Sequence, residues 1–119
     1  MAKILIVDDS KMSRKMLRTI LEGIGHVIVG EAGNGEEGLR LYKELNPEAV
    51  TMDITMPQMD GISSLKEIMK YDENAKVVMI TAAGQSFKLV EALKQGAKEF
   101  ICKPYEPEQI INAMNEVLK

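Results

Sequence analysis

The sequence predicts an α/β fold in which a five-stranded parallel sheet is covered by helices on both faces. Five short apolar runs recur along the chain, and each is followed by a segment with helical periodicity. These runs are apolar throughout instead of alternating, which is typical of strands that are buried on both faces. The length of 119 residues is enough for one core only, so we expect one domain spanning residues 1–119.

The expected strands are short and rich in valine, isoleucine and methionine. They are KILIV at 3–7, VIVGE at 27–31, AVTMD at 49–53, KVVMIT at 76–81 and EFICK at 99–103. Right-handed crossovers leave few ways to arrange five parallel strands. The doubly wound, flavodoxin-like strand order 2-1-3-4-5 fits this length best, and it predicts a ligand site at the carboxyl ends of the first and third strands.

The segments between the strands carry apolar stripes at helical spacing. The stripes lie within residues 12–24, 41–45, 62–69, 89–93 and 110–118. Glycine or Asn-Pro lies where the first, second and fourth of these helices should end, at Gly23 to Gly25, at Asn46-Pro47 and at Gly96. The chain is therefore expected to alternate strictly between strand and helix.

The composition excludes several classes of function. A net charge of −3 argues against nucleic acid as a partner, because the chain has no overall positive field. One cysteine and one histidine argue against a zinc site and a disulfide framework. The short apolar run at the N-terminus ends in two acids and predicts no signal peptide, and no segment approaches the length of a membrane helix. We expect a cytoplasmic protein without membrane insertion.

Polar side chains are expected at four of the five strand ends. Asp8 and Asp9 follow the first strand, and Asp53, Thr81 and Lys103 end the third, fourth and fifth. Two carboxylates about 4 Å apart repel each other by roughly 4 kcal/mol, so a lysine and a hard divalent cation are expected to compensate them. All-oxygen ligands favour Mg²⁺ or Mn²⁺ over zinc. Such a site is suited to receiving a phosphoryl group on an aspartate.

Each of these residues also has an ordinary structural explanation. Asp8, Asp9 or Ser10 would serve equally well as the cap of the first helix. The acid of the third strand fits a loop before a Met-Pro turn, Thr81 is a good β-former and Lys103 suits a solvated edge strand. The site interpretation is favoured because the topology independently brings these strand ends together.

The stretch GNGEEG at 33–38 matches the G-x-G-x-x-G pattern of a phosphate-binding loop. It follows the second strand, which is expected at the edge of the sheet, away from the predicted site. Glu36 and Glu37 also occupy the helix N-terminus that a phosphate would need. The motif therefore predicts a turn and a helix start instead of a nucleotide site.

Four motifs make the chain resemble the receiver domain of response regulators over its full length. They are VDD at 7–9, DITMPQMDG at 53–61, TA at 81–82 and KP at 103–104. The resemblance implies that Asp53 accepts a phosphoryl group from the phosphohistidine of a sensor histidine kinase. It also implies that Asp8, Asp9, Asp53 and the backbone carbonyl of Thr55 bind Mg²⁺, or Mn²⁺ in its place.

The remaining implied roles concern switching. Lys103 would pair with the phosphoryl oxygens, Thr81 would move to hydrogen-bond them, and Phe100 would turn inward as Thr81 moves. The Lys103–Pro104 bond is expected to be cis. Thr55 and Ala83 stand at variable positions that tune loss of the phosphoryl group, and neither offers a carboxylate or an amide to orient water.

The single-domain form resembles chemotaxis regulators most and implies an output by binding. The implied partners are a sensor histidine kinase and a separate target protein, which is the flagellar switch in a chemotaxis system; a phosphatase is a further candidate. The output face would lie around Phe87, Lys98 and Tyr105. The expected class is a signalling phosphoacceptor that catalyses its own phosphorylation and dephosphorylation, not an enzyme with a separate substrate.

Three other functions remain open at this stage. The first is a stand-alone receiver in a phosphorelay outside chemotaxis. An aspartyl-phosphate phosphohydrolase would need a second acid two residues after the nucleophile, where this chain has Thr55. An FMN-binding protein would need a phosphate loop rich in hydroxyl residues and glycine after the first strand, where this chain has Asp8 and Asp9.

Two further features are assigned from local sequence alone. The first helix carries a basic set that predicts a solvated face or, alternatively, a docking surface for an acidic partner; its members are Lys11, Arg14, Lys15 and Arg18. Cys102 lies in an expected strand, which predicts a buried and inert thiol.

Overall fold

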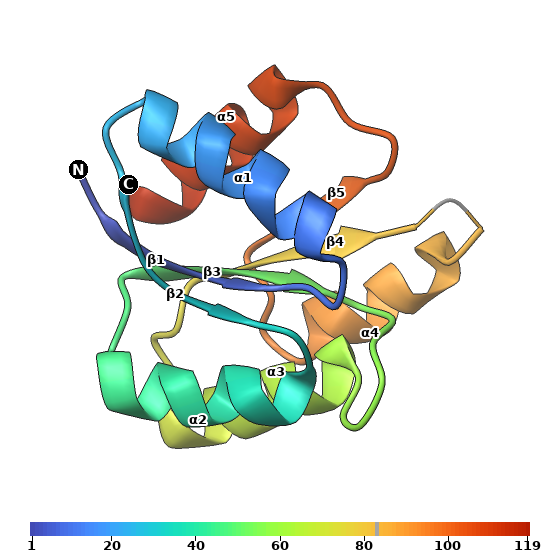
Figure 1. Cartoon of the computed structure of the whole chain (residues 1–119). Helices are drawn as coiled ribbons and strands as arrows, with labels where there is room; N and C mark the ends of the chain where they lie inside the picture. The colour runs from blue at the N-terminus through green and yellow to red at the C-terminus, as the bar shows by residue number, and fades with distance from the viewer. Residues whose placement is uncertain (83) are drawn as a thin grey trace.

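The computed structural model describes residues 1–82 and 84–119 and confirms the predicted alternation of strands and helices (Figure 1). The strands are β1 (Lys3–Val7), β2 (Val27–Ala32), β3 (Ala49–Asp53), β4 (Val77–Thr81) and β5 (Glu99–Cys102). The helices are α1 (Lys11–Gly23), α2 (Gly35–Leu45), α3 (Gly61–Tyr71), α4 (Leu89–Lys94) and α5 (Pro107–Leu118), and a 3₁₀ turn, η1 (Ser86–Lys88), precedes α4. Ala83, one of the two positions expected to tune phosphoryl loss, lies outside the described residues.

All strand pairs are parallel, and the strand order is β2-β1-β3-β4-β5, as predicted. β1 and β3 are neighbours in the centre of the sheet, with Val7 paired to Met52 at their carboxyl ends. The residues that follow β1 and end β3 therefore emerge side by side. β2 lies at one edge of the sheet, as the interpretation of GNGEEG required.

Figure 1 shows α1 and α5 on one face of the sheet and α2, α3 and α4 on the other. Each face has its own apolar core, and alternate residues of a strand enter different cores. Ile4 and Ile6 pack with Leu17 of α1, whereas Leu5 belongs to the cluster that includes Leu65 of α3. This two-sided burial explains why the strands are apolar throughout. Among the described residues, none of the helices combines the length and the apolar character needed to cross a bilayer.

The N-cap of α1 is a serine and not one of the two aspartates. Ser10 is the N-cap, and its Oγ accepts a hydrogen bond of 3.2 Å from the N–H of Ser13. Asp8 uses its Oδ1 to accept the N–H of Ser10 at 2.8 Å. Because the serine supplies the cap, Asp8 and Asp9 are not needed for it.

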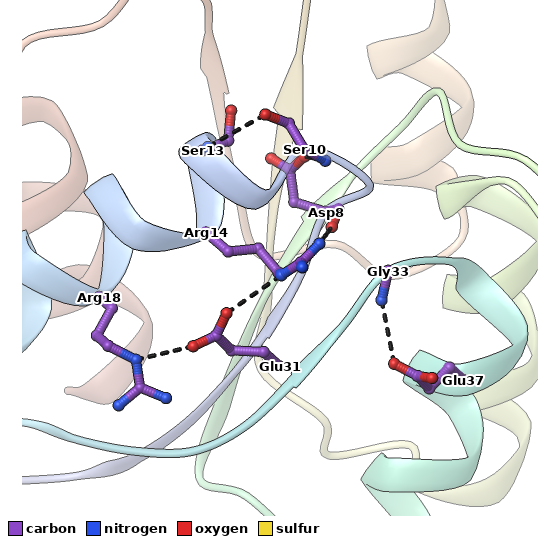
Figure 2. Close-up of polar contacts among 8 residues, drawn as sticks. All are labelled: Asp8, Ser10, Ser13, Arg14, Arg18, Glu31, Gly33 and Glu37. Carbon is purple, nitrogen blue, oxygen red and sulfur yellow. Dashed lines mark hydrogen bonds and ion pairs between the residues drawn. The ribbon is translucent and has the colours of Figure 1, made fainter.

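The GNGEEG stretch forms a turn and the start of α2, as predicted. Oδ1 of Asn34 accepts the N–H of Glu37 at 2.8 Å. Figure 2 shows the second bond, in which Oε1 of Glu37 accepts the N–H of Gly33 at 3.1 Å. A Cβ on Gly35 would lie 2.2 Å from the carbonyl oxygen of Met59. The glycine at this position therefore permits close packing on the loop after β3, and the carboxylate of Glu37 occupies the place where a phosphate would bind.

Thr51, in the middle of β3, carries a buried hydroxyl with no hydrogen-bond partner among the described residues. A buried polar group without a partner lowers stability, and valine has nearly the same shape without the hydroxyl. We expect Thr51→Val to raise the free energy of unfolding by about 1 kcal/mol, measured by urea unfolding. The reverse change on the paired residue of β4, Val78→Thr, is the control and should lower it. A less stable Thr51→Val chain would contradict this account.

Candidate functional site

Three carboxylates meet where the central strands end. Asp8 and Asp9 follow β1 and Asp53 ends β3, and one carboxylate oxygen from each lies within 4.8 Å of the others. Asp8 is 1% exposed and Asp53 is 7% exposed, whereas Asp9 is open to solvent. Because β1 and β3 are adjacent, the three predicted acids lie together, with Asp8 and Asp53 buried and Asp9 exposed.

Lys103 reaches the same place from the end of β5. Its Nζ lies 3.7 Å from Oδ2 of Asp8 and 4.0 Å from Oδ1 of Asp53, so one ammonium faces two carboxylates. β5 ends at Cys102, one residue earlier than expected, and the following Lys103–Pro104 bond is cis, as expected. The lysine therefore leaves the sheet edge and extends toward its centre.

The charges of the site are only partly compensated. Burial, together with the neighbouring Asp8 carboxylate, raises the pKa of Asp53 to about 6, against an opposing effect of Lys103. Burial also raises the pKa of Asp8, although the N–H of Ser10 and the Lys103 ammonium favour its charged form. Both shifts show that one lysine does not offset two buried carboxylates with a third beside them.

The donor set fits a hard divalent cation. Oδ2 of Asp8 is buried and has no hydrogen-bond partner among the described residues, although Lys103 lies nearby. A buried carboxylate oxygen normally has a partner, so this one is available to a ligand. One carboxylate oxygen of Asp8 lies within 4.8 Å of carboxylate oxygens of Asp9 and Asp53. Oxygen donors without histidine or thiolate suit Mg²⁺ or Mn²⁺.

The other predicted site residues, Thr81, Thr55 and Phe100, differ in how far they are buried. Thr81 is fully buried at the end of β4, and among the described residues its hydroxyl donates one long hydrogen bond of 3.4 Å, to the carbonyl of Ala82. Thr55 is exposed in the loop after β3. Phe100 lies on β5 with 45% of its surface exposed, so its ring is not in the core. Within the described part of the chain, the Thr81 hydroxyl thus has one weak partner, and the Phe100 ring lies outside the core.

The loop after β3 is fixed by backbone contacts with the helices beside it. The N–H of Gly61 donates to the carbonyl of Ile54 at 2.7 Å, and the N–H of Gly35 donates to the carbonyl of Met59 at 2.9 Å. The hydroxyl of Ser64 joins α3 to α2, because it donates to the carbonyl of Gly35 at 2.8 Å. A Cβ on Gly61 would lie only 2.0 Å from the carbonyl oxygen of Asp53. The backbone of Asp53 is therefore packed directly against the first turn of α3.

Two sequence-based assignments need correction. Cys102 is exposed, not buried, because β5 is an edge strand on which only alternate residues, such as Ile101, reach the core. Arg14 does not belong to a solvated face: its side chain is 19% exposed, and its Nη1 donates to the backbone carbonyl of Asp8 at 2.6 Å (Figure 2). The sequence offered one indication of this contact, because Arg14 lies near the start of the helix that follows Asp8 and Asp9.

The response regulator receiver domain model matches residues 4–115 of the chain. The chemotaxis protein CheY of Thermotoga maritima is 50% identical over 117 residues, which cover 98% of each chain, and CheY of Bacillus subtilis is 46% identical over 98% of this chain and 97% of its own. A crystal structure of a CheX–CheY–BeF₃–Mg²⁺ complex from Borrelia burgdorferi matches with a TM-score of 0.93 at 41% identity, covering 98% of this chain and 89% of that one.

The chain belongs to the response regulator receiver domain family. Within this family it is a CheY-like receiver domain of two-component chemotaxis signalling, similar to CheY proteins along nearly its whole length. This similarity favours a chemotaxis receiver over a phosphohydrolase, an FMN-binding protein or a receiver of another phosphorelay.

Proposed function

We propose that residues 1–119 work as one receiver domain in which Asp53 accepts a phosphoryl group from the phosphohistidine of a sensor histidine kinase. The observation that carries this proposal is the position of Asp53. Its carboxylate ends a central strand, is nearly buried, and has two further carboxylates and the Lys103 ammonium around it. Such a group is short of compensating positive charge, which an incoming cation and phosphoryl group would reorganise.

In the proposed step, a carboxylate oxygen of Asp53 attacks the phosphorus atom of the donor. The P–N bond of the phosphohistidine breaks, its electron pair stays on the imidazole nitrogen, and an acyl phosphate forms on Asp53. Lys103 lies close enough to Asp53 to pair with a phosphoryl oxygen after small movements of its flexible stem. The step uses no proton from the chain, since the reacting carboxylate is ionised at neutral pH.

Asp8, Asp9 and Asp53, with the backbone carbonyl of Thr55, are the residues that we propose hold Mg²⁺, or Mn²⁺ in its place. A bound divalent cation would neutralise the charge that gathers on the phosphoryl oxygens during transfer. The part of this chain is to present carboxylate oxygens, and Oδ2 of Asp8, which is buried and makes no hydrogen bond among the described residues, supports this role.

We further propose that phosphorylation is read out through Thr81 and Phe100. The loosely bonded hydroxyl of Thr81 would turn toward the phosphoryl group, and the ring of Phe100 would fill the space that this movement opens. The affected face, around Phe87, Lys98 and Tyr105, would bind the downstream target, which is the flagellar switch in a chemotaxis system. Phe87 is 70% exposed there, which suits a partner-binding surface.

The same proposal excludes turnover of a separate substrate. The chain would act as a phosphoacceptor that assists its own phosphorylation and dephosphorylation, with a phosphatase as a further partner. Thr55 offers no carboxylate or amide to orient an attacking water molecule, so we expect unassisted loss of the phosphoryl group to be slow. We also propose a cytoplasmic location, because the ATP that supplies the kinase is found there.

Phosphorylation of the purified chain with acetyl phosphate tests this function. We expect intact mass spectrometry to show one added phosphoryl group in the presence of Mg²⁺, no addition in excess EDTA, and none in Asp53→Asn. Glu36→Gln, which removes an exposed acid on α2, is the matched control and should be modified like the wild type. An unmodified wild-type chain, or an undiminished adduct in Asp53→Asn, would overturn the proposal.

A further inference from the structure

Arg14 joins α1 to the carboxyl end of β1 and to the edge strand β2. Its Nη1 donates a hydrogen bond of 2.6 Å to the backbone carbonyl of Asp8, and its Nε lies 3.1 Å from Oε1 of Glu31 (Figure 2). The guanidinium is a rigid plane, so two bonds in different directions fix its orientation. With 19% of its side chain exposed, Arg14 is largely covered by the elements that it joins.

Glu31 is itself held from a second side. Nε of Arg18 lies 2.8 Å from Oε2 of Glu31, and Nη1 of Arg18 lies 3.0 Å from Oε2 of Glu22. Glu31 therefore shares its two oxygens between two arginines of α1, while 30% of its side chain is exposed (Figure 2). Glu31, which is fixed on β2, thus offers Arg14 an oxygen that Arg18 does not use.

Asp8 is the residue on which these contacts act. Its N–H donates to the carbonyl of Ala32 at 2.9 Å, and its carbonyl accepts from Arg14. Both peptide groups that flank the Cα of Asp8 are therefore restrained. In the carboxylate, Oδ1 accepts the N–H of Ser10, whereas Oδ2 makes no hydrogen bond among the described residues and lies 3.7 Å from Nζ of Lys103.

We propose that Arg14, oriented by Glu31, is a positioning residue that fixes the backbone of Asp8 so that its carboxylate is held beside those of Asp9 and Asp53 before a cation binds. This inference rests on the proposed function in one respect, namely that the Asp8–Asp9 turn binds Mg²⁺. Groups that orient a metal ligand from behind typically change affinity 10- to 100-fold. Because Arg14 holds the backbone of the ligand and not its carboxylate, we expect about a 10-fold effect, at the lower end of that range.

The charge of Arg14 acts in the opposite direction. A cation close to the site repels Mg²⁺, so removing this charge would by itself strengthen Mg²⁺ binding. If Arg14 positions Asp8, its removal would also leave the Asp8 carboxylate less well oriented, and this would weaken Mg²⁺ binding. The direction of the change therefore separates positioning from simple electrostatics.

The test compares Arg14→Met with Arg14→Lys and with the control Arg18→Met. Arg18 pairs with the same Glu31, but its hydrogen bonds go to glutamates and not to Asp8. In the metal-free chain, hydrogen exchange at the N–H of Ser10 should be about tenfold faster in Arg14→Met and nearly unchanged in Arg18→Met. Lysine keeps the charge and one donor, so Arg14→Lys should restore most of the protection.

The second measurement follows the NMR shift of the same amide during a Mg²⁺ titration. Arg14→Met should raise the Kd for Mg²⁺ about tenfold, while Arg18→Met should change it less than about threefold. Unchanged exchange at Ser10, or Mg²⁺ binding in Arg14→Met that equals or exceeds that of Arg18→Met, would overturn the inference. A wild-type chain that does not respond to Mg²⁺ would instead contradict the metal site of the proposed function, and the exchange rates would still decide the role of Arg14.

Discussion

Replacing Asp53 with asparagine is expected to stabilise the metal-free chain at pH 7 by roughly 3 kcal/mol, which corresponds to a rise in Tm of about 10 °C. The side chain is 7% exposed, and burial is the main reason that the pKa of Asp53 rises from 3.8 to about 6. Ionising this carboxyl in the folded chain therefore costs free energy that is not spent in the unfolded chain. Asparagine keeps the shape and removes the charge.

The pH dependence of this effect has a defined sign. Because the pKa of Asp53 is higher in the folded chain, the folded chain binds more protons than the unfolded chain between pH 3.8 and about 6. The free energy of unfolding of the wild type should therefore fall as pH rises through this range. Asp53→Asn lacks this contribution, so the two chains should become equally stable below pH 3.8. Asp8, whose pKa burial also raises, adds a slope of the same sign to both chains.

Urea unfolding in excess EDTA at a series of pH values measures this difference. Glu36→Gln removes an exposed acid at the start of α2 and is the control that should show no stabilisation. Added Mg²⁺ should narrow the gap between the wild type and Asp53→Asn, because a bound cation favours the ionised carboxyl. A wild-type chain that is more stable than Asp53→Asn at pH 7 without metal would show that ionised Asp53 does not destabilise the folded chain.

Replacing Gly61 with alanine is expected to lower the free energy of unfolding by at least about 3 kcal/mol. The added Cβ would lie 2.0 Å from the carbonyl oxygen of Asp53 and 2.8 Å from the Cα of Ile54. Both atoms belong to the backbone, so the clash is relieved only if the end of β3 and the start of α3 move apart. That movement also breaks the hydrogen bond of 2.7 Å from Gly61 to Ile54.

Gly23→Ala is the matched control, since Gly23 also lies in a helix but a Cβ there would meet nothing within 4 Å. This change should be neutral or slightly stabilising, because alanine favours helix more than glycine does. Any folded Gly61→Ala should also accept phosphoryl groups from acetyl phosphate more slowly than Gly23→Ala, since Asp53 has shifted. Equal unfolding free energies for the two variants would show that the loop after β3 adapts to the added methyl group.

The topology and the three aspartates were predictable because both depend on information local to each segment. A buried parallel strand such as AVTMD is recognised by its apolar run, and the end of the run places Asp53 at the carboxyl edge of the sheet. Once the strand order is limited by crossover handedness, Asp8 and Asp53 must lie side by side. The cap alternative was decided only by the structure, in which Ser10 fills that position.

The role of Arg14 was not predictable in the same way. Along α1, helical periodicity places Arg14 beside the buried Leu17 and Leu21, but it does not indicate that the guanidinium meets a glutamate on β2 and the carbonyl of Asp8. The exposure of Cys102 was missed for a related reason. An apolar run predicts burial on both faces, but a strand at the edge of the sheet is covered less completely than a central one.

The exposed thiol of Cys102 has a practical consequence. It is the single cysteine of the sequence, it pairs in register with Thr81, and it directly precedes Lys103. A thiol-reactive fluorophore would therefore attach at one defined place, on the strand that also carries Phe100. The sequence thus already contains one labelling site next to the lysine that faces the acidic cluster, without an engineered cysteine.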